Sequence, residues 1–400
     1  MNVTLAAMGG GDLHSCTWEC IEALKNADLL LGSRRLLDSL PGSCTPNRIA
    51  CHRPLDLLQN ILDSDAEEAV VVYSGDTGFY SGARFLVPLL EQEDVPYRLL
   101  PGVSSVQLLA SKLGEPWQNW NLVSAPGVTC NVVAEVMRGK PTCFLTGGQL
   151  TPDIICQELI DADLGFLSAT VGSCLTSPEE TVETTTVERL ADMEFPPMTV
   201  LLIEPAPSIP RRSPGIPDSA FLRGDVPLSK QPVRAAVLSQ MAVHPDDVIW
   251  DVGAGTGGVS VELALVAPEG RVYAVERNPE ACELIKKNRR KFCAWNLTLV
   301  EGDAPEALLD LPVPDKVFIG GSGGEIRSII ETALEKNSGA LICADAIAME
   351  TLNSAWATMQ QLSLDPEILQ VSAARTRPAG TLHLLLAGNP TFIITGNKND

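Results

Sequence analysis

The residues in this chain best suited to chemistry are the closely spaced glycines of VIWDVGAGTGGV at positions 248–259. Gly253, Gly255 and Gly258 fit the G-x-G-x-x-G pattern of dinucleotide-binding turns, whereas Gly253, Gly255 and Gly257 fit the G-x-G-x-G pattern of S-adenosylmethionine enzymes. Both patterns place glycine where a strand turns into a helix, so that backbone N–H groups can approach a ligand closely. The spacing alone does not choose between NAD and S-adenosylmethionine.

Acidic residues after three successive expected strands favour S-adenosylmethionine. Asp251 lies two positions before the first glycine, where its charge would repel the phosphates of NAD but would attract an ammonium and a sulfonium. Glu276 follows the next strand and can accept hydrogen bonds from both hydroxyls of a ribose. Asp303 follows the third and can accept one from an adenine amino group. A nicotinamide-dependent reductase is the alternative that this charge argument disfavours. The predicted cofactor-binding residues of this half are Asp251, Gly253, Gly255, Gly257, Glu276, Asp303 and Ala304.

Strand and helix patterns alternate around these residues as they do in a Rossmann-like sheet. The expected strands are 248–252, 271–275, 297–300, 316–319, 340–344, 368–374, 382–386 and 392–395. The expected helices are 259–266, 280–292, 305–309, 325–336 and 352–362, with another near Pro232. Because no crossover helix separates the last three strands, they must be antiparallel to one another. Five parallel strands ending in a hairpin predict the mostly parallel seven-stranded sheet of class I methyltransferases.

The first half of the chain also alternates between strands and helices, with glycine-rich loops where strands end. Gly75, Asp76 and Thr77 follow an expected strand at 69–73, and Ser104 and Ser105 follow another that begins at Arg98. Further strands are expected at 2–8 and 29–32, and helices at 17–26 and 153–161. The alternation predicts an α/β domain that binds its ligand at these loops.

A proline-rich stretch divides the two halves. It holds five prolines in the thirteen residues 205–217, which neither a helix interior nor a sheet can accommodate. The predicted domains are therefore 1–204 and 218–400, joined by a stiff linker at 205–217.

Composition excludes several classes of function. A net charge of -21 argues against a nucleic-acid partner, because phosphate binding needs a basic face. No long apolar run predicts a membrane span, and no leader is apparent at the N-terminus, so we expect a cytoplasmic protein. The eleven cysteines and four histidines are scattered without metal-ligand spacing, so we expect no metal site.

The first half resembles the tetrapyrrole methylases, a class III methyltransferase family, over about residues 1–204. The likeness rests on the turn at 9–12 and the stretches GDTGFYS at 75–81 and PGVSS at 101–105. It implies an S-adenosylmethionine site at these loops. The residues it assigns to that site are Gly75, Asp76, Thr77, Ser104 and Ser105.

The second half resembles the decarboxylating precorrin methyltransferases of cobalamin biosynthesis over about residues 218–396. The matching stretches are PLSKQPVR at 227–234, DVGAGTG at 251–257, AVERNP at 274–279, EGDAP at 301–305 and FIGGSG at 318–323. Together the two resemblances imply methylation of a precorrin at carbons 5 and 15, with loss of carbon dioxide from the acetate on carbon 12. A cobalt-containing precorrin is the alternative substrate, and a methyltransferase for a different substrate class is a more distant one. We also expect a homo-oligomer.

The substrate would carry many carboxylates, which need local donors in so acidic a protein. Glycines at Gly320, Gly321 and Gly323 would let a wide, flat ligand approach the backbone, with Ser322 as a hydrogen-bond donor. Basic residues near the expected strand-end loops are the other candidates for positioning the substrate. They are Lys230, Arg234, Arg327, Arg375 and Arg377, with Arg34, Arg35, Arg53 and Arg84 in the first half.

Overall fold

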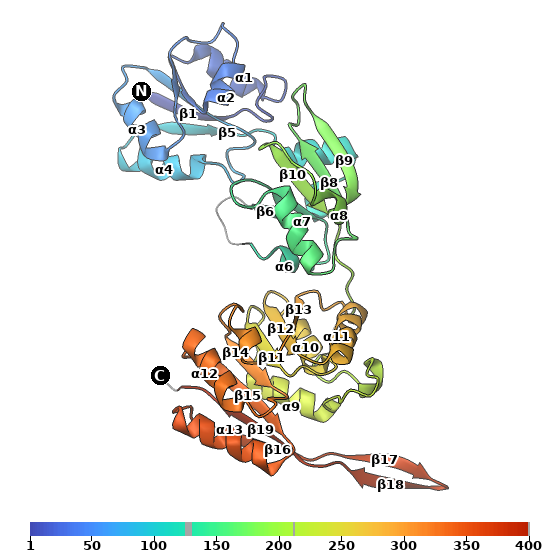
Figure 1. Cartoon of the computed structure of the whole chain (residues 1–400). Helices are drawn as coiled ribbons and strands as arrows, with labels where there is room; N and C mark the ends of the chain where they lie inside the picture. The colour runs from blue at the N-terminus through green and yellow to red at the C-terminus, as the bar shows by residue number, and fades with distance from the viewer. Residues whose placement is uncertain (125–129, 211–212, 399–400) are drawn as a thin grey trace. The chain divides into compact units, whose positions relative to one another are not determined.

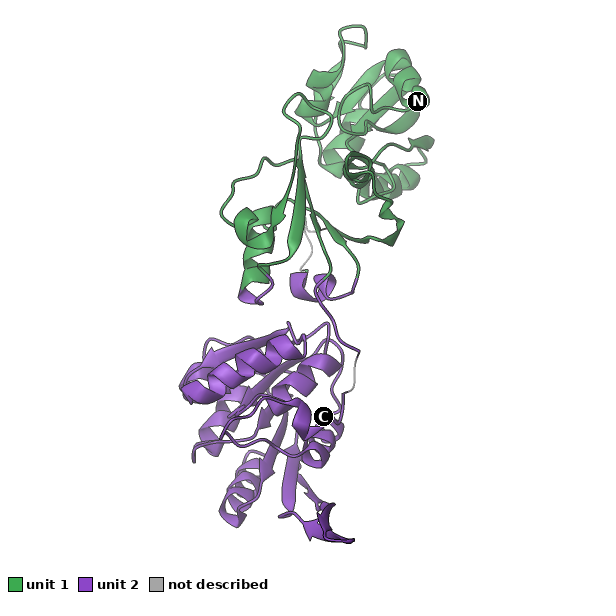
Figure 2. Cartoon of the chain, turned by 90° about the vertical axis from the view of Figure 1, so that its right-hand side faces the viewer, with its two compact units in different colours: residues 1–130, 140–160, 165–205 green, residues 131–139, 161–164, 206–400 purple. Residues whose placement is uncertain are grey.

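The computed structural model describes residues 1–124, 130–210 and 213–398 (Figure 1). The chain forms two compact units, which Figure 2 shows in different colours. The first holds residues 1–130, 140–160 and 165–205, and the second holds 131–139, 161–164 and 206–400. The main division falls between Pro205 and Ala206, at the start of the expected linker. The two arginines of that linker, at 211 and 212, lie outside the described residues.

The first unit begins with a sheet of five parallel strands. These are β1 (Asn2–Ala7), β2 (Leu29–Gly32), β3 (Arg48–Ala50), β4 (Glu68–Tyr73) and β5 (Tyr97–Leu100). Their order is β3-β2-β4-β1-β5, so the loops that follow β1, β4 and β5 meet at one edge. The helices on one face are α1 (Trp18–Asn26) and α2 (Arg34–Ser39), and those on the other are α3 (Pro54–Leu62) and α4 (Ala83–Gln92). Burial on both faces explains the continuous apolar runs of these strands.

A second sheet in the first unit is mixed. Its strands are β6 (Asn121–Ser124), β7 (Thr142–Leu145), β8 (Ser168–Ser173), β9 (Thr181–Thr186) and β10 (Thr199–Ile203). They lie in the order β6-β7-β10-β8-β9, and only β6 and β7 are parallel neighbours. The helices along this part of the chain are α5 (Ser105–Leu113), η1 (Trp117–Asn119), α6 (Val132–Val136), α7 (Pro152–Asp161) and α8 (Val187–Leu190). The predicted α/β class of the first half is confirmed, although its antiparallel strands were not foreseen.

The second unit is built on the predicted seven-stranded sheet. Its strands are β11 (Val248–Val252), β12 (Arg271–Glu276), β13 (Leu297–Glu301), β14 (Lys316–Ile319), β15 (Leu341–Ala346), β16 (Glu367–Val371) and β19 (Thr391–Gly396). The order is β13-β12-β11-β14-β15-β19-β16, and β19 alone runs antiparallel to the other strands. The fold class predicted for this half is confirmed.

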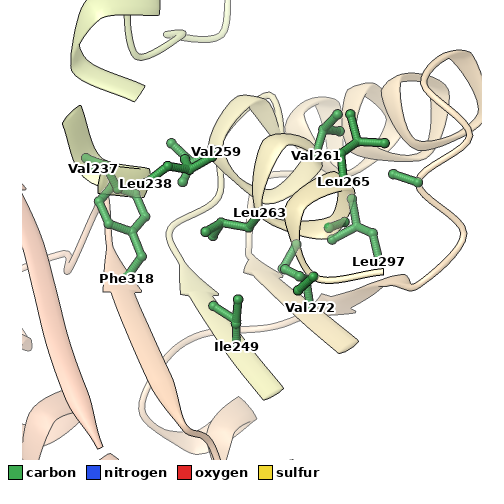
Figure 3. Close-up of a cluster of buried hydrophobic side chains, with 14 of the residues drawn as sticks. Val237, Leu238, Ile249, Val259, Val261, Leu263, Leu265, Val272, Leu297 and Phe318 are labelled. Atoms are coloured by element: carbon green, nitrogen blue, oxygen red, sulfur yellow. The ribbon is translucent and has the colours of Figure 1, made fainter. Parts of the chain in front are cut away.

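Helices cover both faces of that sheet. They are η2 (Asp218–Ala220), α9 (Gln231–Met241), α10 (Gly258–Val266), α11 (Pro279–Lys291), η3 (Glu306–Leu308), α12 (Ile326–Lys336) and α13 (Met349–Gln361). The helix expected at 305–309 is the 3₁₀ turn η3. On one face, Figure 3 shows Val237 of α9 and Leu263 of α10 among side chains from the strands, including Ile249 and Phe318. Helices α12 and α13 pack on the other face. The sheet therefore lies between two apolar layers, one on each face, which fix the positions of the residues at its strand ends.

One expectation about the end of the chain is wrong. The strand expected at 382–386 does not join the sheet but pairs with an unforeseen strand in a separate two-stranded ribbon. The ribbon consists of β17 (Ala374–Ala379) and β18 (Leu382–Ala387), and every one of its residues is exposed. Leu385 is 72% exposed, and an apolar surface of this kind is typical of protein–protein contacts. The expected homo-oligomer stays a prediction.

Two further observations concern the membrane and the cysteines. No helix in the described part of the chain is long and apolar enough to cross a membrane. All eleven cysteines are free thiols.

Candidate ligand sites

The glycine turn between β11 and α10 adopts backbone angles that only glycine takes readily. Gly253, Gly255 and Gly257 have φ values of 73°, 56° and 76°. A Cβ on Gly253 would lie 2.3 Å from the carbonyl oxygen of Gly321, in the loop after β14. The turn is therefore fixed both by its own geometry and by the loop packed against it.

Asp251 is the most unusual group in this region. It is 1% exposed, and its Oδ2 accepts a hydrogen bond from the hydroxyl of Ser260. Its Oδ1 is buried without a hydrogen-bond partner. Burial raises the pKa of Asp251 to about 7, and the charges of Asp345 and Glu276 add to the effect. A buried oxygen without a donor is costly, so this atom points to a ligand that supplies one.

A cavity of about 280 Å³ lies beside Asp251. The predicted residues that line it are Asp251, Gly253, Gly255, Glu276 and Gly320. Gly257 is not among its lining residues; a Cβ there would lie 3.1 Å from Ile285 Cγ1 on α11, so this glycine allows close helix packing. The structure thus brings together five predicted residues and gives Gly257 a different role.

Glu276 holds the glycine turn to the start of α11. Its carboxylate accepts hydrogen bonds from the backbone N–H groups of Gly255, Arg277 and Asn278, at 2.8, 2.9 and 2.9 Å. A carboxylate has about four lone-pair positions, so roughly one acceptor position remains for a ligand hydroxyl. Ribose binding at Glu276 stays a prediction.

A second cavity of about 660 Å³ shares Gly253 and Glu276 with the first. The predicted residues that it adds are Asp303, Ala304, Gly321, Ser322 and Gly323. Asp303 Oδ1 lies 3.1 Å from Nη1 of Arg277, and the Asp303 side chain is 65% exposed. The Ser322 hydroxyl accepts from the N–H of Gly324 at 3.4 Å and keeps its own proton to donate. The two cavities share lining residues, and loops at the strand ends surround both of them.

The structure does not bring Arg234 to these cavities, so the expectation that it positions a substrate is corrected. Its side chain is fully buried, with Nε 2.7 Å from Glu262 Oε1 and Nη1 2.9 Å from Asp218 Oδ1. It also donates to the carbonyls of Ser229 and Ile216. Arg234 therefore fastens the segment before α9 to the core of the unit.

The other basic candidates lie on the surface. Lys230 is the exposed N-cap residue of α9, next to Ser229, which lines the smaller cavity. Arg375 and Arg377 lie on the exposed ribbon, and Arg375 Nη2 is 3.2 Å from Asp218 Oδ2. Neither arginine is among the lining residues of the two cavities.

Sequence reasoning missed Asp345, which lies near the end of β15. Burial raises its pKa to about 7. The available signal was the same as for Asp251 and Glu276, an acid at the end of an apolar strand.

The first unit has a cavity of its own, of about 270 Å³. Four of the five residues predicted for its cofactor site line the cavity, namely Gly75, Asp76, Ser104 and Ser105. Thr77 instead donates to the carbonyl of Leu100 at 3.1 Å and lines a neighbouring groove. Asp76 accepts from the N–H groups of Gly78 and Gly102, at 2.8 and 2.9 Å. Asp76 therefore ties the loop after β4 to the loop after β5.

Of the four arginines suggested for the first half, Arg35 alone lines this cavity. Burial lowers the pKa of its guanidinium, and no carboxylate of the described residues forms an ion pair with it. Binding of an anionic ligand by Arg35 stays a prediction.

Comparisons with known proteins agree on both halves. The family model described as the precorrin methyltransferase domain matches residues 220–396, and that of the tetrapyrrole (corrin/porphyrin) methylases matches residues 2–191. A protein of Pyrobaculum calidifontis, described as a probable cobalt-precorrin-6B C(15)-methyltransferase (decarboxylating), is 43% identical over 46% of this chain and 97% of its own.

Two further relatives concern C(5,15) enzymes. A Sinorhizobium precorrin-6Y C(5,15)-methyltransferase (decarboxylating) is 28% identical over 94% of this chain and 92% of its own. The crystal structure of a precorrin-6y C5,15-methyltransferase from Geobacter metallireducens is 40% identical, covers 46% of this chain and 96% of that one, and has a TM-score of 0.44.

Proposed function

The chain belongs to the precorrin methyltransferases, with a tetrapyrrole methylase domain ahead of the precorrin methyltransferase domain, and from this premise we propose that it methylates a precorrin at carbons 5 and 15 and releases carbon dioxide from the acetate on carbon 12. The Sinorhizobium relative, named for both methylations and the decarboxylation, aligns with 94% of this chain and so supports a role for both halves. The observation that carries the proposal for the second unit is the unpartnered, buried oxygen of Asp251 beside the glycine turn.

We propose S-adenosylmethionine as the methyl donor at both sites. In the second unit, Asp251 would hold its ammonium group, the glycine turn its amino-acid part, and Glu276 and the loop at Asp303 its nucleoside. The residues fit such a ligand, because Oδ1 of Asp251 lacks a hydrogen-bond donor and the turn has no side chains at its glycines. When bound, the donor supplies an electrophilic methyl group attached to a sulfonium.

The chain's own residues mainly position the macrocycle. The ring carbon is the nucleophile in an in-line displacement, so the protein has to fix orientation and exclude water. Gly321 and Gly323 line the larger cavity and Gly320 the smaller one, so no side chains separate their backbone from a flat ligand there. The Ser322 hydroxyl can donate to one of the ligand's carboxylates. The conjugated ring accepts the electrons that remain when carbon dioxide leaves, as a bound electron-sink cofactor does elsewhere.

A cobalt-containing precorrin is the second candidate substrate. It is favoured by the archaeal relatives named for cobalt-precorrin-6B, which are 37–43% identical but align with the second half alone. One experiment separates the candidates: the full chain is incubated with labelled S-adenosylmethionine and either the metal-free or the cobalt-containing intermediate. We expect two methyl groups and one carbon dioxide per metal-free ring. No methyl transfer to either ring would contradict the proposed function.

The affinity of the second unit for S-adenosylmethionine should fall as the pH drops below about 7. The buried Asp251 carboxyl has a pKa raised to about 7, and a cationic ligand binds its ionised form. Binding at lower pH must therefore release a proton, which weakens it by roughly tenfold between pH 7.5 and 6. Titration calorimetry measures this, with Asp251→Asn as the reference chain that keeps the site of the first unit. An affinity of the second site that does not change with pH would contradict the predicted role of Asp251.

A further inference from the structure

The register of the central strands places Asp345 on the same face of the sheet as Asp251. Asp251 pairs with Phe318, and Phe318 pairs with Cys343. Side chains alternate along a strand, so these three residues share the face that α9 and α10 cover, and Asp345 shares it because it lies two positions after Cys343. Asp345 is therefore one row closer than Asp251 to the carboxyl edge of the sheet.

The row that contains Asp345 is open on the side of the cavity. Two positions after Asp251 and Phe318 come Gly253 and Gly320, and both glycines line the cavity of about 280 Å³. On its other side Asp345 pairs with Ile393, which is buried. Because Gly253 and Gly320 have no side chains, Asp345 has the first side chain in this row after them. The buried Ile393 lies on its other side.

The charges around Asp345 leave its carboxyl free to exchange a proton. Its charge acts on Asp251, so the two carboxyls lie within electrostatic reach of one another. The one charged side chain within α9, which packs on the same face, is Arg234, and that charge is paired with Glu262 and Asp218. No side chain of the described residues hydrogen-bonds to the Asp345 carboxyl, and burial raises its pKa to about 7. A group with these properties suits proton transfer near neutral pH.

The proposed methylation at carbon 15 releases one proton, and the decarboxylation consumes one. When the methine carbon 15 gains a methyl group, its C–H bond must break to restore conjugation, and a proton is released. When the acetate carboxylate leaves as carbon dioxide, the C–C bond breaks, its electron pair enters the ring, and a new C–H bond to the remaining carbon consumes a proton. The two steps together require no oxidant and no net acid.

We propose that Asp345 is the proton-transfer residue of the second unit, taking the proton that carbon 15 loses and supplying the proton that the decarboxylated side chain gains. The assignment rests on the proposed function and adds to it the general base and acid. Ile319 pairs with Ala344, so the next residues of the two segments are Gly320, which lines the cavity that holds Asp251, and Asp345. A ring docked against Gly320 would lie on the side of Asp345.

The test compares Asp345→Asn, Asp345→Glu and the control Glu367→Gln, whose exposed side chain lies at the start of β16. Methyl transfer and carbon dioxide release are measured separately in single turnovers of the full chain from pH 5.5 to 8.5. We expect Asp345→Asn to lower both second-unit rates by roughly 100-fold or more, as for loss of a general acid–base group, while Asp345→Glu restores part of them and the control matches wild type. At saturating S-adenosylmethionine, where the effect of Asp251 on donor binding no longer limits the rate, the wild-type methyl transfer should rise with pH through about 7, because the carboxylate is the base. This rise should be absent in Asp345→Asn.

A second readout does not depend on turnover. The carbon-13 carboxyl resonance of Asp345, identified by its absence from Asp345→Glu, should titrate between pH 6 and 8. Wild-type carbon dioxide release in Asp345→Asn with an unchanged pH profile would overturn the inference, and so would a resonance that stays ionised down to pH 5. A wild-type chain that neither methylates nor decarboxylates any precorrin would instead overturn the proposed function, so the two failures are distinct.

Discussion

Asp251→Ala is expected to abolish one of the two methyl transfers together with carbon dioxide release, and to leave the other methyl transfer intact. The substitution removes a buried carboxylate that has one oxygen without a hydrogen-bond partner and that lines a cavity of the second unit, while the first unit keeps its own cavity around Asp76. Mass spectrometry of the product resolves the outcomes as a gain of one methyl, with or without loss of carbon dioxide. Loss of both methyl transfers would show that the units do not act separately.

Asp76→Ala provides the reciprocal test. It removes the acceptor that joins Gly78 and Gly102, so the loops of the first cavity should lose their arrangement. We expect methylation at carbon 5 to disappear while carbon dioxide release stays nearly unchanged, provided the second unit receives its own substrate. If Asp76→Ala eliminated decarboxylation under that condition, the division between the units would have to be abandoned.

The largest effect on stability is expected at Arg234. Arg234→Met leaves Glu262, which is fully buried, without its charged partner, and breaking a buried ion pair in this way typically costs about 3–5 kcal/mol. Urea unfolding of the full chain should show the transition of the second unit shifted to lower denaturant, with that of the first unit unchanged. A matched control is Arg327→Met on α12, whose ion pair with Glu331 is exposed and is worth at most about 1 kcal/mol.

The double variant Arg234→Met with Glu262→Gln should recover part of the lost stability, because it removes the orphaned charge as well. Equal unfolding free energies for Arg234→Met and Arg327→Met would mean that the buried pair contributes no more than a surface pair.

The strands of the second unit could be predicted because most are buried on both faces and so read as apolar runs between turn residues. The ribbon could not, because the apolar run at Leu384, Leu385 and Leu386 looks like that of a buried sheet strand, and sequence does not reveal that no sheet lies beside it. Which strand a segment pairs with depends on the tertiary structure around it and not on its own residues alone.

Which candidate residues lie together could be predicted where they stand at strand ends, but not where their positions depend on a long-range partner. Asp251 and Glu276 lie near the carboxyl ends of neighbouring parallel strands, so their meeting at one edge follows from the order of the sheet. Arg234 was assigned to a ligand because Glu262, on α10, cannot be recognised from sequence as its buried partner. Asp345 was overlooked because no motif contains it, although the pairing register places it near Asp251.

The contact between Gly253 and Gly321 has a consequence for protein engineering. The two loops are so close that any side chain at position 253 would overlap the facing backbone, since its Cβ would lie only 2.3 Å from the carbonyl oxygen of Gly321. A cofactor turn grafted from another methyltransferase would therefore fit only if the loop after β14 were transplanted with it. The part of this unit assigned to the methyl donor and the part assigned to the macrocycle have to be exchanged as a single module.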